Sequence, residues 1–355
     1  MAEPLVSIIL GFYNQRPDFL RATIRSVLAQ TYQNFDLVVS DNHSTNGSSK
    51  VLDEFSDPRM RVIRPPQHVA MVPHFAFAAQ HAKGEFISFL ASDDLVSPDW
   101  LEALVPMFDD RPDVVFGFGE IANFPFEDPD QIRFLCREGM FPTGIYSAEQ
   151  LLPLIFPFNR ASSWMVGDLI RIDAYRQTAG NNFLEKAGIA YSGDHALSLR
   201  LLEIGSAAYV NKVVAKHRSW GTEEGKVDGL RYAASVSDAV KLYEMLERSS
   251  KLAFALANHH AALGVAKRNK ARMLTLGLFE AIATKTIEPL KISEAKVGIL
   301  TIYSSPSLRT ALAFCNTTLA PAWRAVLSPA KKAYAAGIGR ALNWQGVDRK
   351  LTFRS

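Results

Sequence analysis

Short apolar runs alternate along the first part of the chain with segments in which apolar residues recur at spacings of three and four. The runs predict buried strands, and the periodic segments predict helices that cover a sheet face. The predicted strands are Leu5–Leu10, Phe35–Asp41, Arg59–Arg64, Phe86–Leu90 and Val114–Phe118. The predicted helices are Phe19–Gln30, Ser48–Phe55, Val72–Lys83 and Trp100–Phe108. This alternation indicates an α/β fold with a mostly parallel central sheet.

The pattern changes further along the chain. Mixed elements follow the first part, namely helices near Ser147–Phe156 and Asp194–Ile204 and strands near Met165–Ile172 and Tyr209–Ala215. From about Val227 the chain is almost wholly helical by its periodicity. We therefore predict a sheet-bearing domain over residues 1–222 and a helical C-terminal region over residues 223–355.

The composition is that of an ordinary globular protein, with 48% hydrophobic and 21% charged residues in 355. No run reaches the ~18 uninterrupted apolar residues that a membrane-spanning helix needs. Only Cys136 and Cys315 occur, which excludes a disulfide framework and suits a reducing compartment. The N-terminus shows no signal-peptide pattern. We expect a cytoplasmic protein, with no nucleic acid among its partners.

Basic residues are concentrated at the C-terminal end of the chain. Ala320–Ser355 holds seven Lys or Arg residues against one acid, whereas the whole chain carries a net charge of only +3. The same segment contains Trp323 and Trp344, which suit a membrane interface. Two interpretations stay open: peripheral attachment to an anionic membrane surface at the inner face of the cell membrane, or a helical cap with a solvated basic edge.

Two adjacent carboxylates, Asp93 and Asp94, follow the apolar run Phe86–Leu90 almost directly. The carboxyl ends of parallel strands are where open α/β sheets bind ligands. Paired carboxylates at such a place suit a divalent cation that bridges the protein to a diphosphate. Taken alone, the pair could instead cap the helix that follows.

Other predicted strands also end in candidate residues. Gly11 and Tyr13 close the first strand, where an aromatic ring can stack on a base and a small residue lets a backbone come close. Asp41 ends the second strand, where its carboxylate can accept hydrogen bonds. Taken singly, Tyr13 also fits a core aromatic residue and Asp41 a turn residue.

In combination, these motifs resemble family 2 glycosyltransferases. The segments that carry the resemblance are Val6–Asn14, Ile24–Tyr32, Leu37–Thr45 and Ala82–Asp94. The resemblance covers roughly residues 4–220. It implies a Rossmann-like nucleotide-sugar domain of the GT-A type, an inverting transfer, and a divalent cation, Mg²⁺ or Mn²⁺.

The resemblance also assigns roles to individual residues. It implies that Asp94 binds the metal directly and that Asp93 contacts the ribose or metal-bound water. It also implies that Asp41 accepts a hydrogen bond from a pyrimidine ring N–H. Asp194 matches the family acid that acts as general base on the acceptor hydroxyl, although its place before an apolar periodic segment also fits a helix N-cap. His217 lies where related enzymes often place a histidine near the metal and diphosphate, and it equally fits a surface histidine at a strand end.

The chain departs from the family pattern at two positions. Ala91 stands where many relatives have an additional acid. Phe75 lies in a region where relatives use an arginine to contact the nucleotide, and a phenyl ring cannot do this. His68, His74 and Arg64 are the candidates to replace that arginine, and the sequence does not choose among them.

We therefore predict an inverting, metal-dependent hexosyl- or deoxyhexosyltransferase. Its donor would be a UDP- or dTDP-sugar, and its acceptor a saccharide or lipid-linked saccharide in cell-surface polysaccharide assembly. The rival is a catalytically impaired glycosyltransferase-like scaffold or membrane-recruitment protein. Phe75 and Ala91 favour the rival, and the retention of all three acids at positions 93, 94 and 194 opposes it.

Overall fold

The computed structural model of the chain describes residues 3–125, 128–132, 134–135, 142–155, 166–178, 186–189, 192–219, 229–257 and 287–313, with a few helical residues between 267 and 282. Contacts divide the chain into two compact units, Met1–Gly221 with Lys241–Leu263, and Thr222–Val240 with Gly264–Ser355. The boundary near residue 222 stays a prediction. The basic segment Ala320–Ser355 lies outside the described residues.

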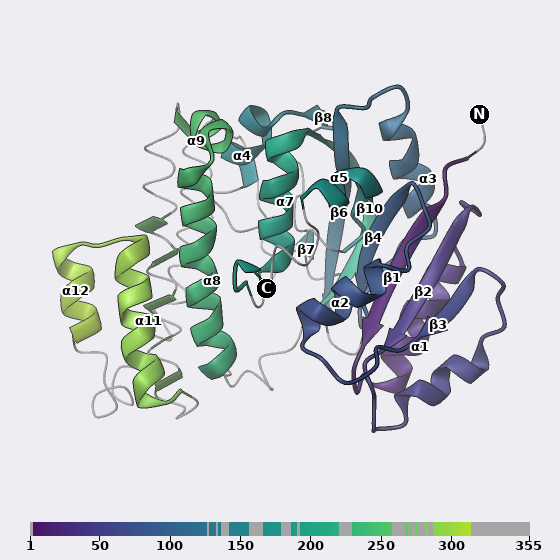
Figure 1. Ribbon diagram of the computed structural model, residues 1–355, viewed down its shortest axis with the longest axis horizontal. Coiled ribbons are helices and arrows are strands. Elements are labelled where there is room, and N and C mark those ends of the chain that lie inside the picture. Colours follow the sequence, from purple (N-terminus) through teal and green to yellow (C-terminus); the bar gives the residue numbers. More distant parts are fainter. Residues whose placement is uncertain are drawn as a thin grey trace. The chain divides into compact units, whose positions relative to one another are not determined.

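One sheet of ten strands forms the centre of the first unit, in the order β3-β2-β1-β4-β9-β6-β10-β5, with β7 paired to β6 and β8 to β10 (Figure 1). The strands are β1 Val6–Phe12, β2 Phe35–Asp41, β3 Met60–Ile63, β4 Phe86–Ala91, β5 Leu95–Val96, β6 Val114–Pro125, β7 Phe134–Leu135, β8 Gly144–Tyr146, β9 Leu169–Arg171 and β10 Ser206–Ser219. Strands β3, β2, β1 and β4 run parallel, as do β6 and β10. The predicted α/β fold with a mostly parallel sheet is confirmed.

Strand β9 differs from the simple alternation that the sequence predicts. It lies between β4 and β6 and is antiparallel to both. β9 therefore begins towards the carboxyl edge of the sheet and runs in the direction opposite to β4 and β6. The sheet is therefore mixed in its middle and parallel at the end formed by β1, β2, β3 and β4.

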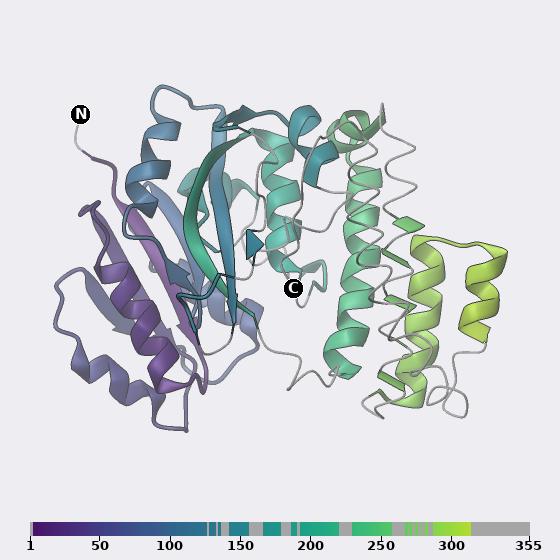
Figure 2. The same ribbon diagram turned by 180° about the vertical axis from the view of Figure 1, so that it is seen from behind.

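Helices cover both faces of the parallel part of the sheet (Figure 1, Figure 2). The helices of the first part of the chain are α1 Pro17–Leu28, η1 Ser48–Glu54, α2 Met71–Ala79, α3 Trp100–Leu104, η2 Val105–Phe108, α4 Ala148–Ile155, α5 Ile172–Gln177 and α7 Gly193–Ile204. Helices α1 and α3 pack on one face and α2 on the other. Later helices are α8 Gly229–Arg248, α9 Ser250–Ala257, α11 Pro289–Ile302 and α12 Pro306–Ala313.

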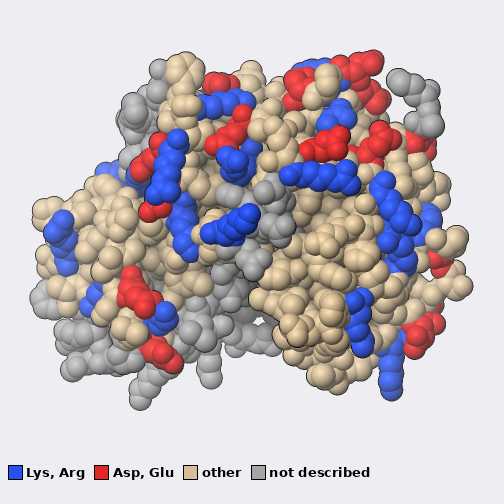
Figure 3. Space-filling view, viewed as in Figure 1, with Lys and Arg blue, Asp and Glu red and all other residues tan. Residues whose placement is uncertain are grey.

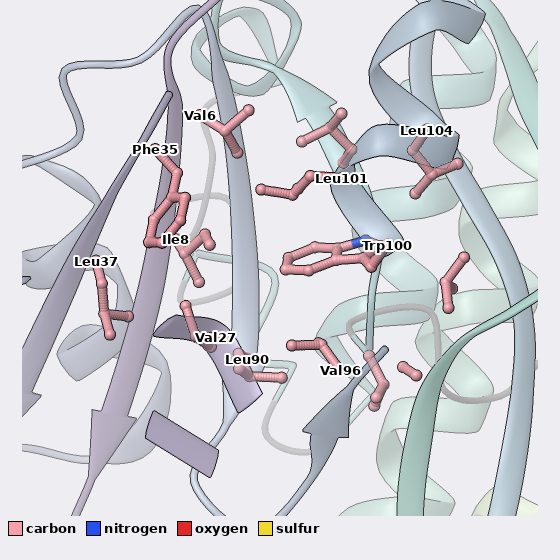
Figure 4. Close-up of a cluster of buried hydrophobic side chains, with 14 of the residues drawn as sticks. Val6, Ile8, Val27, Phe35, Leu37, Leu90, Val96, Trp100, Leu101 and Leu104 are labelled. Atoms are coloured by element: carbon pink, nitrogen blue, oxygen red, sulfur yellow. The ribbon is translucent and has the colours of Figure 1, made fainter. Parts of the chain in front are cut away.

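The main hydrophobic core lies between the sheet and helices α1 and α3 (Figure 4). Alternate residues of a strand point to the same face, so Val6, Ile8 and Leu10 of β1 all enter this core. Trp100, the largest fully buried side chain, lies in the middle of the cluster, and its indole N–H donates to the Gly167 carbonyl at 3.0 Å. The one polar atom of this ring is therefore satisfied.

Helix α1 also carries a polar stripe that holds the chain after β4 in place. The Thr23 hydroxyl donates to the carbonyl of Asp94 at 2.8 Å. Just past the end of α1, the Gln30 amide donates to the Ser97 carbonyl at 2.7 Å and accepts from the Leu101 N–H at 3.2 Å. The helix thus fixes the backbone on both sides of β5, starting at the second acid of the pair.

The second unit is helical in the part that the structure describes. Within it, Gly298 of α11 lies against Val236 of α8, and a Cβ at Gly298 would come within 2.7 Å of that side chain. Among the described helices, none combines the length and hydropathy needed to cross a bilayer. Acidic and basic side chains are interspersed over the described part of the face shown in Figure 3.

A close backbone approach explains the glycine of the Ala-Lys-Gly motif before β4. The Ser7 hydroxyl oxygen accepts the backbone N–H groups of Lys83 and Gly84, both at 2.9 Å. This brings the two segments so close that a Cβ at Gly84 would lie 2.5 Å from the carbonyl oxygen of Leu5. Only glycine avoids this clash without a backbone shift.

We expect Gly84→Ala to lower the free energy of unfolding by about 1–3 kcal/mol, because overpacking against fixed backbone forces a shift. Gly144→Ala is the matched control, since its added methyl would be no closer than 3.6 Å to Tyr146. Urea denaturation of both variants measures the difference. Equal stabilities of the two variants would show that the Gly84 backbone relaxes without cost.

Candidate functional site

The strand ends that carry the candidate residues lie side by side at one edge of the sheet. Gly11 of β1 pairs with Ser40 of β2 on one side and with Ala91 of β4 on the other. The three strands are parallel, so the segments that follow them leave the sheet at the same edge. The predicted residues at this edge are Tyr13, Asp41, Asp93 and Asp94.

Asp41 is a buried carboxylate with several hydrogen-bond donors around it. Its Oδ1 accepts a hydrogen bond from the Ser44 N–H at 2.8 Å, and its Oδ2 accepts one from the Ser49 hydroxyl at 2.7 Å. Oδ2 also forms an ion pair with Arg64. Burial opposes ionisation, but the donors, the Ser44 amide foremost among them, outweigh it and hold the pKa of Asp41 below its usual value. Asp41 is therefore ionised and acts as an acceptor at neutral pH.

Tyr13 presents an aromatic ring at the same edge. Tyr13 is half exposed to solvent, with 49% of the residue accessible. The ring of His68 lies 4.3 Å from the Tyr13 ring, centroid to centroid, and is tilted by 41°. Tyr13 is thus not a core aromatic residue, and its ring is supported from one direction by His68.

His74 packs against Gly11 inside the protein, beneath the end of β1. His74 is 4% exposed, and its Nε2 lies 2.8 Å from the Ser40 hydroxyl. Burial lowers the pKa of His74 to about 4, so the ring is neutral at physiological pH. A Cβ at Gly11 would lie 3.2 Å from this imidazole and 3.3 Å from Phe75, so the small residue lets α2 pack on β1.

The two acids after β4 differ in their surroundings. Asp94 is 3% exposed, and its Oδ1 accepts the backbone N–H of Arg218 at 2.8 Å. Asp93 is less buried, and its carbonyl accepts Nε–H of Arg218, also at 2.8 Å. Ser92, just before them, receives a hydrogen bond from the Gln15 amide at 2.9 Å. The acid pair is therefore held by fixed contacts on several sides.

Arg218 organises the acid pair, and the sequence analysis did not single it out. Its guanidinium is buried between two rings, 3.7 Å from the Phe19 centroid and 4.6 Å from that of Phe124. Cation–π contacts of this kind stabilise a desolvated arginine. Arg218 follows His217 in a strand whose sequence gives no sign of which basic residue turns inward. A buried charge of this kind is visible only in the tertiary structure.

Burial raises the pKa of Asp94 well above its usual value, and the neighbouring charge of Asp93 acts in the same direction. The Arg218 amide and charge oppose this shift. Ionised Asp94 is therefore costly in the absence of a further positive charge. A divalent cation beside the pair would remove that cost.

His217, on β10, lies within electrostatic reach of both Asp93 and Asp194. Burial lowers the pKa of His217, while these two carboxylates act against the shift. Its Nδ1 lies 3.2 Å from the side-chain amide of Asn123 on β6. As placed, the Asn123 amide nitrogen donates to Nδ1, which puts the imidazole proton on Nε2; a cation at Nε2 would require the proton on Nδ1 and the Asn123 oxygen turned towards it.

Asp194 lies in the first turn of α7 but does not cap the helix. The N-cap position belongs to Ser192, and the Asp194 carboxylate lies 3.0 Å from Nδ1 of His195. Its side chain is 15% exposed. Asp194 is therefore not the N-cap residue of α7. Its role as a general base stays a prediction.

Asp168 is a second buried carboxyl group near Asp194, and the sequence analysis missed it. It directly precedes β9, is 4% exposed, and accepts the Ser88 hydroxyl at 3.2 Å. Burial raises the pKa of Asp168 to about 8 despite the Ser88 hydrogen bond, and the charge of Asp194 adds to the increase. Its segment offers no sequence motif, so only the antiparallel insertion of β9 places it here.

The described residues contain no group of three or more His, Cys, Asp or Glu side chains arranged to hold a metal ion. A cation of the Mg²⁺ kind is commonly bound by one or two carboxylates together with substrate phosphates and keeps several waters. The oxygen donors of Asp93 and Asp94, with His217 nearby, are of the right type. Such a cation would be shared between the protein and a bound diphosphate.

Comparisons with known proteins point to one sequence family. Residues 7–159 match the sequence family described as Glycosyl transferase family 2. An uncharacterized protein of Sinorhizobium fredii is 36% identical over 246 residues, which cover 68% of this chain and 24% of the relative. The Escherichia coli UDP-Glc:alpha-D-GlcNAc-diphosphoundecaprenol beta-1,3-glucosyltransferase WfgD is 35% identical over 169 residues, covering 44% of this chain and 66% of that protein.

Other relatives and solved structures are more distant. The Bacillus subtilis putative teichuronic acid biosynthesis glycosyltransferase TuaG is 32% identical over 102 residues, which cover 28% of this chain and 40% of that protein. The chain thus spans less than two thirds of these relatives' own lengths. The crystal structure of S. aureus TarS 1–349 in complex with UDP has a TM-score of 0.55 at 11% identity, covering 90% of this chain and 91% of TarS 1–349. That similarity shows a shared fold.

The Asp168 carboxyl predicts a specific pH dependence of stability. Its pKa is about 8 in the folded state and near 3.8 when unfolded, so between these values the folded protein binds the additional proton. Its contribution to stability is therefore present at low pH and is lost as the pH rises towards about 8. Asp168→Asn, a neutral isostere, should raise the free energy of unfolding at pH 8 by about 1–3 kcal/mol, with a smaller gain at pH 5. Urea denaturation at several pH values tests this, and an identical pH slope in both proteins would contradict it.

Proposed function

Because the chain belongs to glycosyl transferase family 2 through residues 7–159, we propose that it transfers a sugar from a nucleotide-diphosphate donor to a saccharide or lipid-linked saccharide, with inversion at the anomeric carbon. The observation that carries this proposal is the acid pair at the carboxyl edge of the parallel strands. The same edge holds an exposed aromatic ring and a buried, ionised carboxylate. This combination suits a nucleotide whose diphosphate ends beside the acids.

The donor site would begin at Tyr13 and Asp41. The half-exposed ring of Tyr13 offers a stacking surface for a base. Asp41, held ionised by its donors, can accept a ring N–H, which favours a uracil or thymine base over one that lacks a ring N–H. A UDP- or dTDP-sugar is therefore the donor that we propose, and the fold is shared with a protein crystallised with UDP.

The diphosphate would lie beside Asp93 and Asp94. Family members generally use a divalent cation, and a cation held by this pair, with His217 nearby, would neutralise the charge that develops on the departing diphosphate. The chain contributes the fixed position of the acids. Arg218 holds both of them through its N–H groups, and Thr23 holds the Asp94 carbonyl. Preorganised acids of this kind need no rearrangement when the donor binds.

Asp194 is the residue that we propose as general base. As an acceptor-side carboxylate it would take the proton of the attacking hydroxyl, while the diphosphate leaves from the opposite face of the sugar. The charge of Asp194 acts to raise the pKa of His217 and of Asp168, which supports a position near these two residues. The contact with Nδ1 of His195 restricts its side chain.

The acceptor class rests on the relatives. The name of the E. coli relative states a diphosphoundecaprenol-linked saccharide acceptor, and the B. subtilis relative is named for teichuronic acid biosynthesis. We propose a saccharide acceptor, carried on a lipid diphosphate, in the assembly of a surface polysaccharide. An acceptor of this kind would bring the enzyme to a membrane surface.

The first test is Asp94→Ala. We expect transfer to be lost and the Mn²⁺-dependent part of UDP affinity to disappear, because the pair loses its buried carboxylate. Titration calorimetry with UDP, with and without Mn²⁺, measures this. Asp113→Ala is the control. It removes an exposed carboxylate that pairs with Arg111 just before the first residue of β6, and it should leave both quantities unchanged. Retention of Mn²⁺-dependent affinity in Asp94→Ala would disprove the assignment.

A second test separates the base from the donor site. Asp194→Asn keeps the size of the side chain but cannot accept a proton, so the transfer rate should fall by ~10²–10⁴ while UDP affinity is retained. Asp173→Asn is the matched control, because Asp173 also lies in the first turn of a helix and its side chain is 93% exposed. Turnover within a few-fold of wild type in Asp194→Asn would show that another group takes the proton.

A further inference from the structure

We infer that Arg64 acts with Asp41 to read the base of the donor, as a donor–acceptor pair that selects a ring N–H beside a carbonyl oxygen. Arg64 thus replaces the family arginine whose region this chain fills with Phe75. The inference rests on the proposed function, because it concerns the base of the same nucleotide.

The register of the sheet places Arg64 beside Asp41. The last residue of β3, Ile63, pairs with Ser40, so the next residues along the two parallel strands are Arg64 and Asp41. The guanidinium forms an ion pair with Asp41 through Nη2. The Arg64 side chain is 52% exposed, whereas that of Asp41 is 2% exposed. The pair therefore consists of a fixed inner acceptor and an accessible outer donor.

The other two candidates for the missing arginine are excluded by their surroundings. His74 is buried under Gly11 and is neutral, so it reaches no ligand at this edge. His68 is exposed, but its Nδ1 lies 3.0 Å from the carbonyl of Asn42 and its ring is placed against Tyr13. His68 thus shapes the aromatic surface, and Arg64 is the one of the three that combines exposure, charge and contact with Asp41.

Both members of the pair are held in place before any ligand binds. The Asp41 oxygens are oriented by Ser44 and Ser49. The loop after β3 is tied to the end of β2 by a two-way amide contact, in which Asn42 donates to the Val69 carbonyl at 2.7 Å and accepts the Val69 N–H at 3.0 Å. Preorganisation of this kind converts hydrogen bonds into affinity with little ordering cost.

The chemistry of the pair fits one pyrimidine edge. A carboxylate has about four acceptor sites, of which Ser44, Ser49 and Arg64 use three in Asp41, and a guanidinium has five N–H donors, so each can keep the ion pair and also bond to a base. Uracil and thymine offer a ring N–H flanked by carbonyl oxygens. Cytosine offers a ring nitrogen acceptor and an amino group, which would face the carboxylate and the guanidinium with the wrong polarity. Leaving such groups unpaired is what gives strong discrimination.

The experiment compares UDP with CDP, because the two share every group except the base edge. Titration calorimetry in the presence of Mn²⁺ should show wild-type protein preferring UDP. In Arg64→Gln and Arg64→Lys, UDP affinity should fall by about 10–100-fold, the usual effect of losing a charge-assisted hydrogen bond. CDP affinity should change little, so the preference for UDP should largely disappear.

Arg61→Gln is the matched control. Arg61 lies in β3, three residues before Arg64, and pairs with another carboxylate of β2, Asp36, at the opposite end of β2. This variant should keep the wild-type preference. Thermal melting of each variant verifies that it is folded under the binding conditions, and the lysine variant preserves the ion pair with Asp41 if the glutamine variant does not fold.

The outcomes separate this inference from the proposed function. Wild-type protein that binds UDP and CDP equally, or Arg64 variants that lose both nucleotides in the same proportion or lose neither, would overturn the role of Arg64 alone. An equal loss would indicate a contact with the phosphates that both nucleotides share. Wild-type protein that binds neither nucleotide, with or without Mn²⁺, would overturn the proposed function as well.

Discussion

The hydrogen bonds that hold the backbone immediately after β4 are the constraint on which the rest of the site depends. Two carboxylates at a strand end repel each other, and one of them is almost fully buried. Such an arrangement persists only if the surrounding structure fixes it. The backbone N–H of Arg218 donates to the Asp94 carboxylate, and the Thr23 hydroxyl of α1 donates to the Asp94 carbonyl. These contacts fix the backbone after β4, and they do so around a buried acid, Asp94, whose ionisation is unfavourable.

This constraint distributes charge over the site in a particular way. The buried groups nearest the sheet are pushed towards their neutral forms, as the pKa values of His74 and Asp168 show. The carboxylate that stays ionised at depth, Asp41, does so because three donors surround it, namely the Ser44 N–H, the Ser49 hydroxyl and Arg64. The edge therefore has two different regions. Asp41 can accept an N–H group of a base, and the Asp93–Asp94 pair would be stabilised by an added cation. The base and the diphosphate of a nucleoside diphosphate are complementary to these two regions.

Sequence reasoning predicted the parts of this arrangement that are local. Buried strands that end in polar residues, such as the run before Asp93, are recognisable by their pattern, and the register of parallel strands then brings their ends together. The parts that it missed depend on long-range placement. Nothing near Arg218 or Asp168 in the sequence indicates burial, and the antiparallel β9 that positions Asp168 is three residues long. Which of three basic residues meets Asp41 was also a question of tertiary structure.

The departures from the family pattern have a physical explanation that does not require loss of function. Phe75 packs edge-on against Phe89 and beside Gly11, so this residue is part of an apolar contact between α2 and the sheet. A charged residue would be poorly solvated there. A guanidinium is nevertheless present beside the nearby carboxylate, because Arg64, just after β3, pairs with Asp41 and is itself half exposed. Phe75 alone is therefore weak evidence for a non-catalytic scaffold.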